Sequence, residues 1–155
     1  MDLYEVIRRE HVKILKTFRK LEKTIASARP AERARLLHET KSRVLALNRM
    51  ENTYFYPLVN DAAEGEAAAA RSRTENEEIE RLLTEMEQRP GEEKDSKPLI
   101  DRLTGAIEQH IEYEEEELFP LARKIIPEEQ ACAVAEDAER EKERLRHEYV
   151  QRPAA

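Results

Sequence analysis

Histidine and glutamate side chains occur in this sequence at positions that would face the interior of a helical protein. In the stretch "EQHIEYEEEELFPL", His110 and Glu114 lie four residues apart, so a helix projects both from one face. His11 and Glu51 lie in other segments with the same helical spacing of apolar residues. Mixed imidazole and carboxylate donors suit iron, manganese or zinc. Two hypotheses stay open at this point: the four side chains bind metal, or the histidines pair with the glutamates in a buried hydrogen-bonded network.

The apolar residues repeat in alternating steps of three and four along the chain, which predicts helices with one buried face each. On the first helix the inward row includes His11, and on the third it includes Asn76. The rows of the second and fourth helices are Leu37, Thr40, Val44, Leu47, Glu51, Tyr54 and Leu58, and Ile100, Leu103, Ile107, His110, Glu114, Glu117 and Leu121. By the same spacing Glu112, Glu115 and Glu116 fall outside the row and are expected to be solvated.

Prolines and glycines divide the chain into helical segments joined by short connections. Four long helices with short connections predict an all-α, up-down-up-down four-helix bundle with a shorter C-terminal fifth helix. Pro98 is expected in the first turn of the fourth helix. The helices are expected at about 3–27, 31–57, 65–89, 95–120 and 127–150. The predicted domains are residues 1–125 for the bundle, 126–150 for a C-terminal helix packed on or extending it, and 151–155 for a tail.

Composition narrows the classes of function. The 155 residues suit one domain, and the net charge of −7 argues against nucleic acid as the main partner. No stretch approaches the roughly 20 apolar residues that span a bilayer, and no signal peptide is visible. The single Cys132 cannot form an internal disulfide. These features predict a cytoplasmic protein without nucleic-acid or membrane partners.

An internal repeat relates the two halves of the predicted bundle. The second helix matches the fourth at an offset of 63 residues, and the first matches the third at an offset of 65. The equivalent pairs include Leu47 with His110, Glu51 with Glu114, Pro57 with Pro120, and His11 with Asn76. Counting back from the turns places His11, Leu47, Asn76 and His110 at one level of the bundle. The two glutamates then lie one turn away, about 6 Å along the axis.

The order of these motifs resembles the hemerythrin-like, or HHE cation-binding, family. "HIEYEEEELFPL" is similar to the second HxxxE element of that family, and "LNRMENTYFYPL" is similar to the first. The resemblance covers about residues 1–125. It implies a four-helix bundle that holds a non-haem di-iron centre. Members of the family bind dioxygen or nitric oxide, handle peroxide, sense iron or oxygen, or repair iron centres.

The resemblance also implies roles for individual residues. Glu51 and Glu114 match the two carboxylates that bridge the irons, while His11 and His110 match the histidines of the first and fourth helices. Two family histidines are replaced, the one on the second helix by Leu47 and the one on the third helix by Asn76. Each iron would therefore lose one imidazole. The predicted metal ligands are His11, Glu51, His110 and Glu114; the auxiliary candidates are Asn76, Glu80 and Tyr54, and Leu47 marks a lost ligand position.

Two functions follow as competing hypotheses. In the first, the reduced ligand set binds one metal or two weakly, iron before manganese or zinc, and handles or senses dioxygen, nitric oxide or peroxide. Any catalysis would then be metal-dependent oxidoreductase chemistry, because motifs for phosphate loops, nucleophile elbows and thiol chemistry are absent. In the second, a degenerate bundle without metal serves as a protein-interaction or regulatory module. The sequence carries no signal for the oligomeric state.

Overall fold

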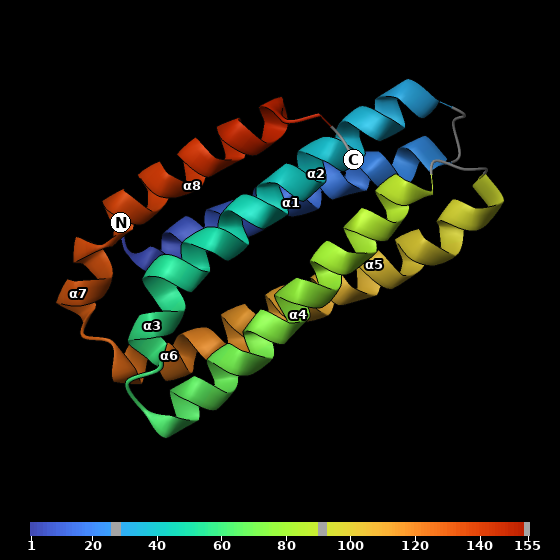
Figure 1. Cartoon of the computed structure of the whole chain (residues 1–155). Helices are drawn as coiled ribbons and strands as arrows, with labels where there is room; N and C mark the ends of the chain where they lie inside the picture. The colour runs from blue at the N-terminus through green and yellow to red at the C-terminus, as the bar shows by residue number, and fades with distance from the viewer. Residues whose placement is uncertain (26–28, 90–92, 154–155) are drawn as a thin grey trace.

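The computed structural model describes residues 1–25, 29–89 and 93–153, and within those ranges all regular secondary structure is helical. Four long helical arms run up and down around a common core, which confirms the all-α four-helix bundle (Figure 1). The elements are α1 (Leu3–Ile25), α2 (Pro30–Met50), the π-helical turn η1 (Glu51–Phe55), α3 (Tyr56–Val59), α4 (Ala63–Gln88), α5 (Glu93–Tyr113), the π-helical turn η2 (Glu114–Leu118), α6 (Phe119–Ile125), α7 (Glu128–Ala133) and α8 (Ala135–Gln151).

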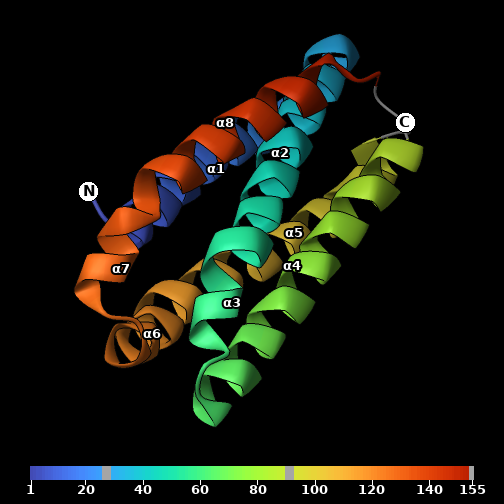
Figure 2. The same cartoon turned by 60° about the vertical axis from the view of Figure 1, so that its left-hand side comes forward.

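The helices form two antiparallel pairs, and the C-terminal helix packs on only one of them. The first pair is α1 with α2, and the second is α4 with α5 (Figure 2). The C-terminal helix α8 lies along α1 and α2, on the side away from α4 and α5. The single fifth helix expected near the C-terminus is broken at Val134, which separates α7 from α8.

Local chemistry explains where several helices begin. The Asp2 side chain accepts a hydrogen bond from the backbone N–H of Glu5 at 2.9 Å, which caps the first turn of α1. Pro30 is the first residue of α2, where its missing N–H leaves no helical bond unmade. The expectation for Pro98 was wrong, because α5 begins at Glu93 and the proline lies inside the helix.

Two π-helical turns occur at equivalent places in the internal repeat. In η1 the backbone N–H of Tyr56 donates to the carbonyl of Glu51, five residues earlier, and in η2 Phe119 donates to Glu114 in the same way. A proline follows each of these donors in the sequence. Because a proline ring clashes with the carbonyl four residues before it, a widened turn ahead of the proline relieves the contact. The helix thus continues past the proline with one extra residue in the turn.

The extra residue shifts the buried face, and this overturns part of the predicted inward rows. Glu117, expected inside, is exposed, and Leu118 is buried instead. In the first copy Tyr54 is only half-buried, and its neighbour Phe55 is buried. The regular alternation of three and four steps holds up to Glu51 and Glu114 and fails after them. Leu58 and Leu121, predicted on the same rows, are likewise half-buried.

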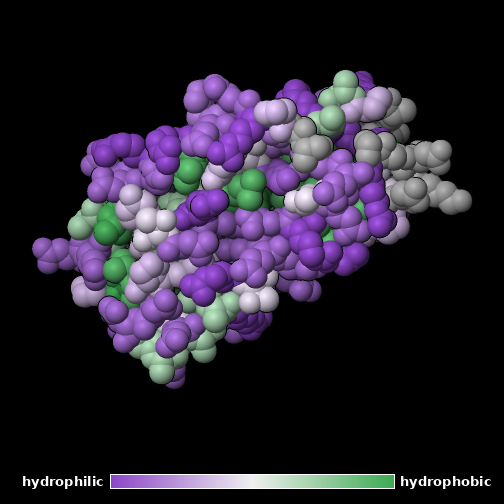
Figure 3. Space-filling view, viewed as in Figure 1, coloured by the Kyte–Doolittle hydropathy of each residue, from purple (hydrophilic) through white to green (hydrophobic). Residues whose placement is uncertain are grey.

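An aromatic cluster fills the core beside the π turns. Tyr4 packs edge-to-face against Phe119 with ring centroids 5.1 Å apart, and Phe55 contacts both rings. Such contacts contribute beyond simple burial of apolar area. The outer face in Figure 3 is mostly hydrophilic, with small separate hydrophobic areas. Among the described residues, no helix is both long and apolar enough to pass through a lipid bilayer.

Gly65 on α4 is required by a close approach between α4 and the end of α3. A Cβ atom at this position would lie 2.0 Å from the carbonyl oxygen of Val59 and 2.8 Å from Cδ1 of Ile125. Backbone atoms cannot yield to such a contact without moving a helix. By contrast, a Cβ at Gly105 would meet no atom within 4 Å.

We therefore expect the two glycines to respond in opposite directions to alanine. Gly65→Ala should lower the free energy of unfolding by about 1–3 kcal/mol, because α3 and α4 must separate. Gly105→Ala should raise it by about 0.5–1 kcal/mol, because alanine favours the helix interior. Urea denaturation of both variants measures the two free energies of unfolding. Equal effects would contradict the close approach between α3 and α4.

Candidate metal centre

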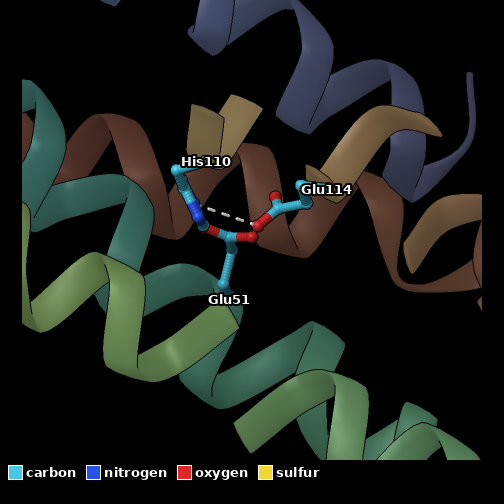
Figure 4. A group of neighbouring side chains, drawn as sticks. All are labelled: Glu51, His110 and Glu114. Carbon is cyan, nitrogen blue, oxygen red and sulfur yellow. Dashed lines mark ion pairs between the residues drawn. The ribbon is translucent and has the colours of Figure 1, made fainter. Parts of the chain in front are cut away.

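Three buried side chains converge where the two π turns meet α5. Glu51 comes from η1, Glu114 from η2, and His110 from the last turn of α5 (Figure 4). One ligand atom of each lies within 4.8 Å of the others. Atoms bound to one ion about 2.1 Å away lie at most about 4.2 Å apart, so a small contraction would let the three share a cation. The sequence repeat thus brings its two glutamates face to face.

His11 approaches the same cluster from α1. Its Nε2 lies 3.6 Å from Oε1 of Glu114, and its ring centroid lies 6.5 Å from that of His110. Its Nδ1 donates to Oε2 of Glu115 at 2.9 Å. The expectation that Glu115 is solvated was therefore wrong. Its side chain is 27% exposed, and one of its oxygens accepts the hydrogen bond from the His11 ring. With Nδ1 as the donor, Nε2 is turned toward the carboxylates.

His110 is held in the same manner by a carboxylate from another helix. Its Nδ1 donates to Oε1 of Glu75 on α4 at 3.0 Å, and its Nε2 lies 3.2 Å from Oε2 of Glu114. Each imidazole therefore has one half-exposed glutamate on its outer nitrogen and a buried carboxylate on its inner one. Carboxylates in such outer positions fix the ring and raise the basicity of a metal-ligating histidine. Sequence spacing could not find these pairs, because each joins two different helices.

Hydroxyl and amide groups support the carboxylates from the opposite side. Ser72 donates to Oε2 of Glu114 at 2.8 Å. The hydroxyl of Tyr56 lies 2.9 Å from Oγ of Ser72 and 3.3 Å from Oε2 of Glu51. Asn76 donates its amide N–H to the same tyrosine oxygen at 2.9 Å. Each of these side chains is buried, so the network is closed to solvent.

Tyr56 was missed by the sequence reasoning, which gave its neighbour Tyr54 as an auxiliary candidate. The π turn explains the error. It places Tyr56, five residues after Glu51, on the same face as that glutamate. The signal that could have found it is the proline directly after Tyr56, which matches Pro120 in the second copy.

Each of the four predicted ligands has one buried atom that makes no hydrogen bond. Among the residues that the structure describes, the buried side-chain atoms without a hydrogen bond include Nε2 of both histidines and one carboxylate oxygen of each glutamate. Buried polar atoms in proteins are nearly always hydrogen-bonded. The atoms concerned are His11 Nε2, His110 Nε2, Glu51 Oε1 and Glu114 Oε1. Two nitrogen and two oxygen donors left over at one place fit a transition-metal cation.

The ionisation of the cluster reflects two carboxylates enclosed together. Burial and the neighbouring Glu114 raise the pKa of Glu51 well above its usual value. Burial alone would also raise the pKa of Glu114, but its interactions with Glu51 and both histidines outweigh burial and hold that pKa well below the usual range. One carboxyl thus keeps a proton while the other is ionised.

Both imidazoles are biased toward the charged form. Burial opposes this, but contacts with Glu114 and Glu75 overcome it and raise the pKa of His110 to about 9. Burial is likewise outweighed at His11, whose pKa is raised by Glu114 and Glu115. Without metal, protons therefore serve as the counter-charges of the buried carboxylates.

The two replaced histidine positions lie beside the cluster around a small cavity. Leu47 and Asn76 line a space of about 20 Å³ together with both histidines. Counting back from the turns had placed these four residues at one level of the bundle. A cavity of this size has room for about one water molecule. The remaining auxiliary candidate, Glu80, is half-buried beside Asn48 and Arg49, and is not in the group of side chains that converge.

Comparison with known proteins identifies the family of the chain. A family model described as the hemerythrin HHE cation-binding domain matches residues 2–122. The chain belongs to this family. Searches among curated proteins and among solved structures find no significant match.

Membership of the hemerythrin HHE family implies metal binding, and Glu51, His110 and Glu114 form a group of described side chains that could hold the ion. The matched range contains both histidines, both glutamates and the two π turns. It ends within α6, so α7 and α8 lie beyond the part that the family shares.

The raised pKa of His110 predicts how stability depends on pH in the metal-free protein. Because folding favours the protonated ring, its contribution is complete below the unfolded pKa of 6.5 and is lost as pH rises through about 9. We expect the free energy of unfolding, measured in chelator, to fall by on the order of 3 kcal/mol across that window. His11 acts in the same direction.

Substitution of single histidines tests this dependence. His110→Gln should flatten the fall between pH 6.5 and 9, whereas His147→Gln, at an exposed position on α8, should leave it unchanged. A fall of equal size in His110→Gln would show that other groups cause it.

Proposed function

We propose that the chain binds one redox-active divalent cation, iron in first place, through His11, Glu51, His110 and Glu114. The observation that carries this proposal is the set of four buried donor atoms, two nitrogens and two oxygens, that make no hydrogen bond. Manganese and zinc accept the same donor types and are the alternatives. A bound iron would supply electron transfer and Lewis acidity for the handling or sensing of dioxygen, nitric oxide or peroxide.

The surrounding residues have distinct tasks in this proposal. Glu75 and Glu115 hold the outer nitrogen of each imidazole, so that the inner nitrogen faces the cation. Tyr56 and Ser72 hold the carboxylates on the other side. Loading requires that His11, His110 and Glu51 release protons, so binding should strengthen as pH rises.

The side of Leu47 and Asn76 is where an exogenous ligand would approach. The cavity there is lined mostly by apolar side chains, and Leu47 offers no donor atom. A small neutral molecule fits such a place better than a charged substrate does. We therefore infer that a small exogenous molecule would reach a bound cation from this cavity, and that any catalysis would be oxidoreductase chemistry of the metal.

A second candidate is a metal-free module that binds another protein. Leu47 favours it, because an apolar residue at a ligand position completes a core without metal. The Asn76 amide also favours it, since its N–H is already bonded to Tyr56. The exposed thiol of Cys132 agrees with the cytoplasmic location proposed for either function.

Metal content decides between the two candidates. Protein purified without chelator or added metal should contain close to one equivalent of iron or manganese, measured by elemental analysis. Glu114→Gln should lose this metal, because it removes an anionic ligand without changing side-chain size. Glu116→Gln, two residues further on and exposed, is the matched control and should retain it. Metal-free protein whose thermal stability is the same in chelator would favour the protein-binding module.

Restoring the two missing imidazoles tests the assignment of the ligand positions. Leu47→His combined with Asn76→His should raise the metal content toward two per chain, because both side chains line the cavity beside the existing histidines. Leu47→Met with Asn76→Gln changes the same positions without adding imidazoles. No gain of the histidine pair over this control would place the lost ligands elsewhere.

A further inference from the structure

A buried lysine from the C-terminal helix enters the bundle next to a predicted metal ligand. Lys142 on α8 is 1% exposed, and its Nζ lies 2.9 Å from Oε2 of Glu10 on α1. Glu10 is also 1% exposed and directly precedes His11. Of the described residues, Lys142 is the one lysine or arginine that is fully buried. Its contact joins residues 132 positions apart in the chain.

The carboxylate of Glu10 connects three helices. Its other oxygen, Oε1, accepts a hydrogen bond from Nη1 of Arg43 on α2 at 3.0 Å. Lys142 is further held by Glu143 at 2.9 Å and by Glu139 at 3.5 Å, both on its own helix. Burial opposes the charged form, but Glu10 outweighs it and raises the pKa of Lys142. The lysine therefore remains charged inside the protein.

The internal repeat shows what Glu10 would otherwise do. Its equivalent at the offset of 65 is Glu75, which orients the His110 ring. The residue equivalent to His110 is Leu47, so Glu10 has no ring to orient. Glu75 is 26% exposed, and α8 has no counterpart over the pair α4 and α5 in Figures 1 and 2. In the first half of the repeat, Leu47 stands where the second half has His110. The helix α8 thus covers the carboxylate of Glu10, which has no imidazole to orient.

We propose that Lys142 is a positioning residue for the metal centre: by binding Glu10 it fixes the turn of α1 that carries His11. This inference rests on the proposed metal-binding function. It extends the site to a helix that lies beyond the range matched by the family.

The ion pair contributes to how α8 docks, because few large apolar side chains of this helix are buried. Its other buried residues are Ala135, Ala138 and Tyr149, and the two alanines bury little apolar area. Removal of the lysine leaves a buried carboxylate with Arg43 as its remaining cation, and a buried charge without full compensation forces a local rearrangement. Because Glu10 and His11 are adjacent on one turn, movement of the first displaces the second. A ligand displaced by about 1 Å binds metal poorly.

Cobalt(II) titration measures this effect, because its visible spectrum reports the ligands around the ion. Lys142→Met should weaken Co²⁺ binding about tenfold and change the spectrum. Arg140→Met, on the same helix at a position 69% exposed, is the matched control and should bind as the wild type does. Lys142→Gln, whose amide can still donate to Glu10, should retain part of the affinity. It also serves as the second variant if the methionine variant does not fold.

A double-mutant comparison separates positioning from general stability. In a His11→Ala background, where Glu51, His110 and Glu114 still offer three donors, Lys142→Met should have no further effect on Co²⁺ affinity. An equal loss in both backgrounds would show that Lys142 acts on stability alone and overturn the inference. Unchanged binding by Lys142→Met beside a wild type that binds would also overturn it, while the proposed function stands. Failure of the wild type to bind Co²⁺ would overturn the proposed function itself.

Discussion

Two glutamates enclosed together in the core impose a condition on the rest of the protein. Glu51 and Glu114 each enter on a π turn and have no exposed surface, so their charges must be neutralised from within. His11 and His110 supply that neutralisation from α1 and α5, either as cations or as metal ligands. Tyr56 and other buried polar groups hold the carboxylates in place. Each of the four long arms of the bundle thus contributes a side chain to the cluster around these two buried carboxylates.

The two halves of the repeat meet this condition differently, and the differences depend on one another. In the second half, Glu75 orients His110 and stays partly open to solvent. In the first half, leucine at position 47 leaves Glu10 with no ring to orient, and a buried anion without a partner would be costly. Arg43 of α2 and Lys142 of α8 provide the cations that balance this carboxylate. The leucine at position 47 and the buried ion pair from α8 are therefore consistent with each other.

The sequence was sufficient for the helices and for the inward direction of the four predicted ligands, because both follow from one period of apolar residues. It failed after Glu51 and Glu114, where the π turn adds a residue that this period does not contain. Tyr54 was therefore proposed in place of Tyr56. The pairing of Glu115 with His11 was also out of reach, because it depends on how two helices are rotated against each other. The contact of Lys142 with α1 has no periodic signal at all, since its helix lies outside the repeat.

Metal and protons compete for the same atoms of this site, which links its function to its stability. The raised pKa values of His11, His110 and Glu51 mean that the metal-free cluster favours three protons beside the ionised Glu114. A divalent cation that displaces three protons lowers the charge of the cluster by one unit. Arg43 of α2 and Lys142 of α8 both bind Glu10, which directly precedes His11, so they hold the turn of α1 that carries this ligand. The half of the bundle that has leucine at position 47 would thus support metal binding through the position of His11, although it offers no imidazole of its own from α2.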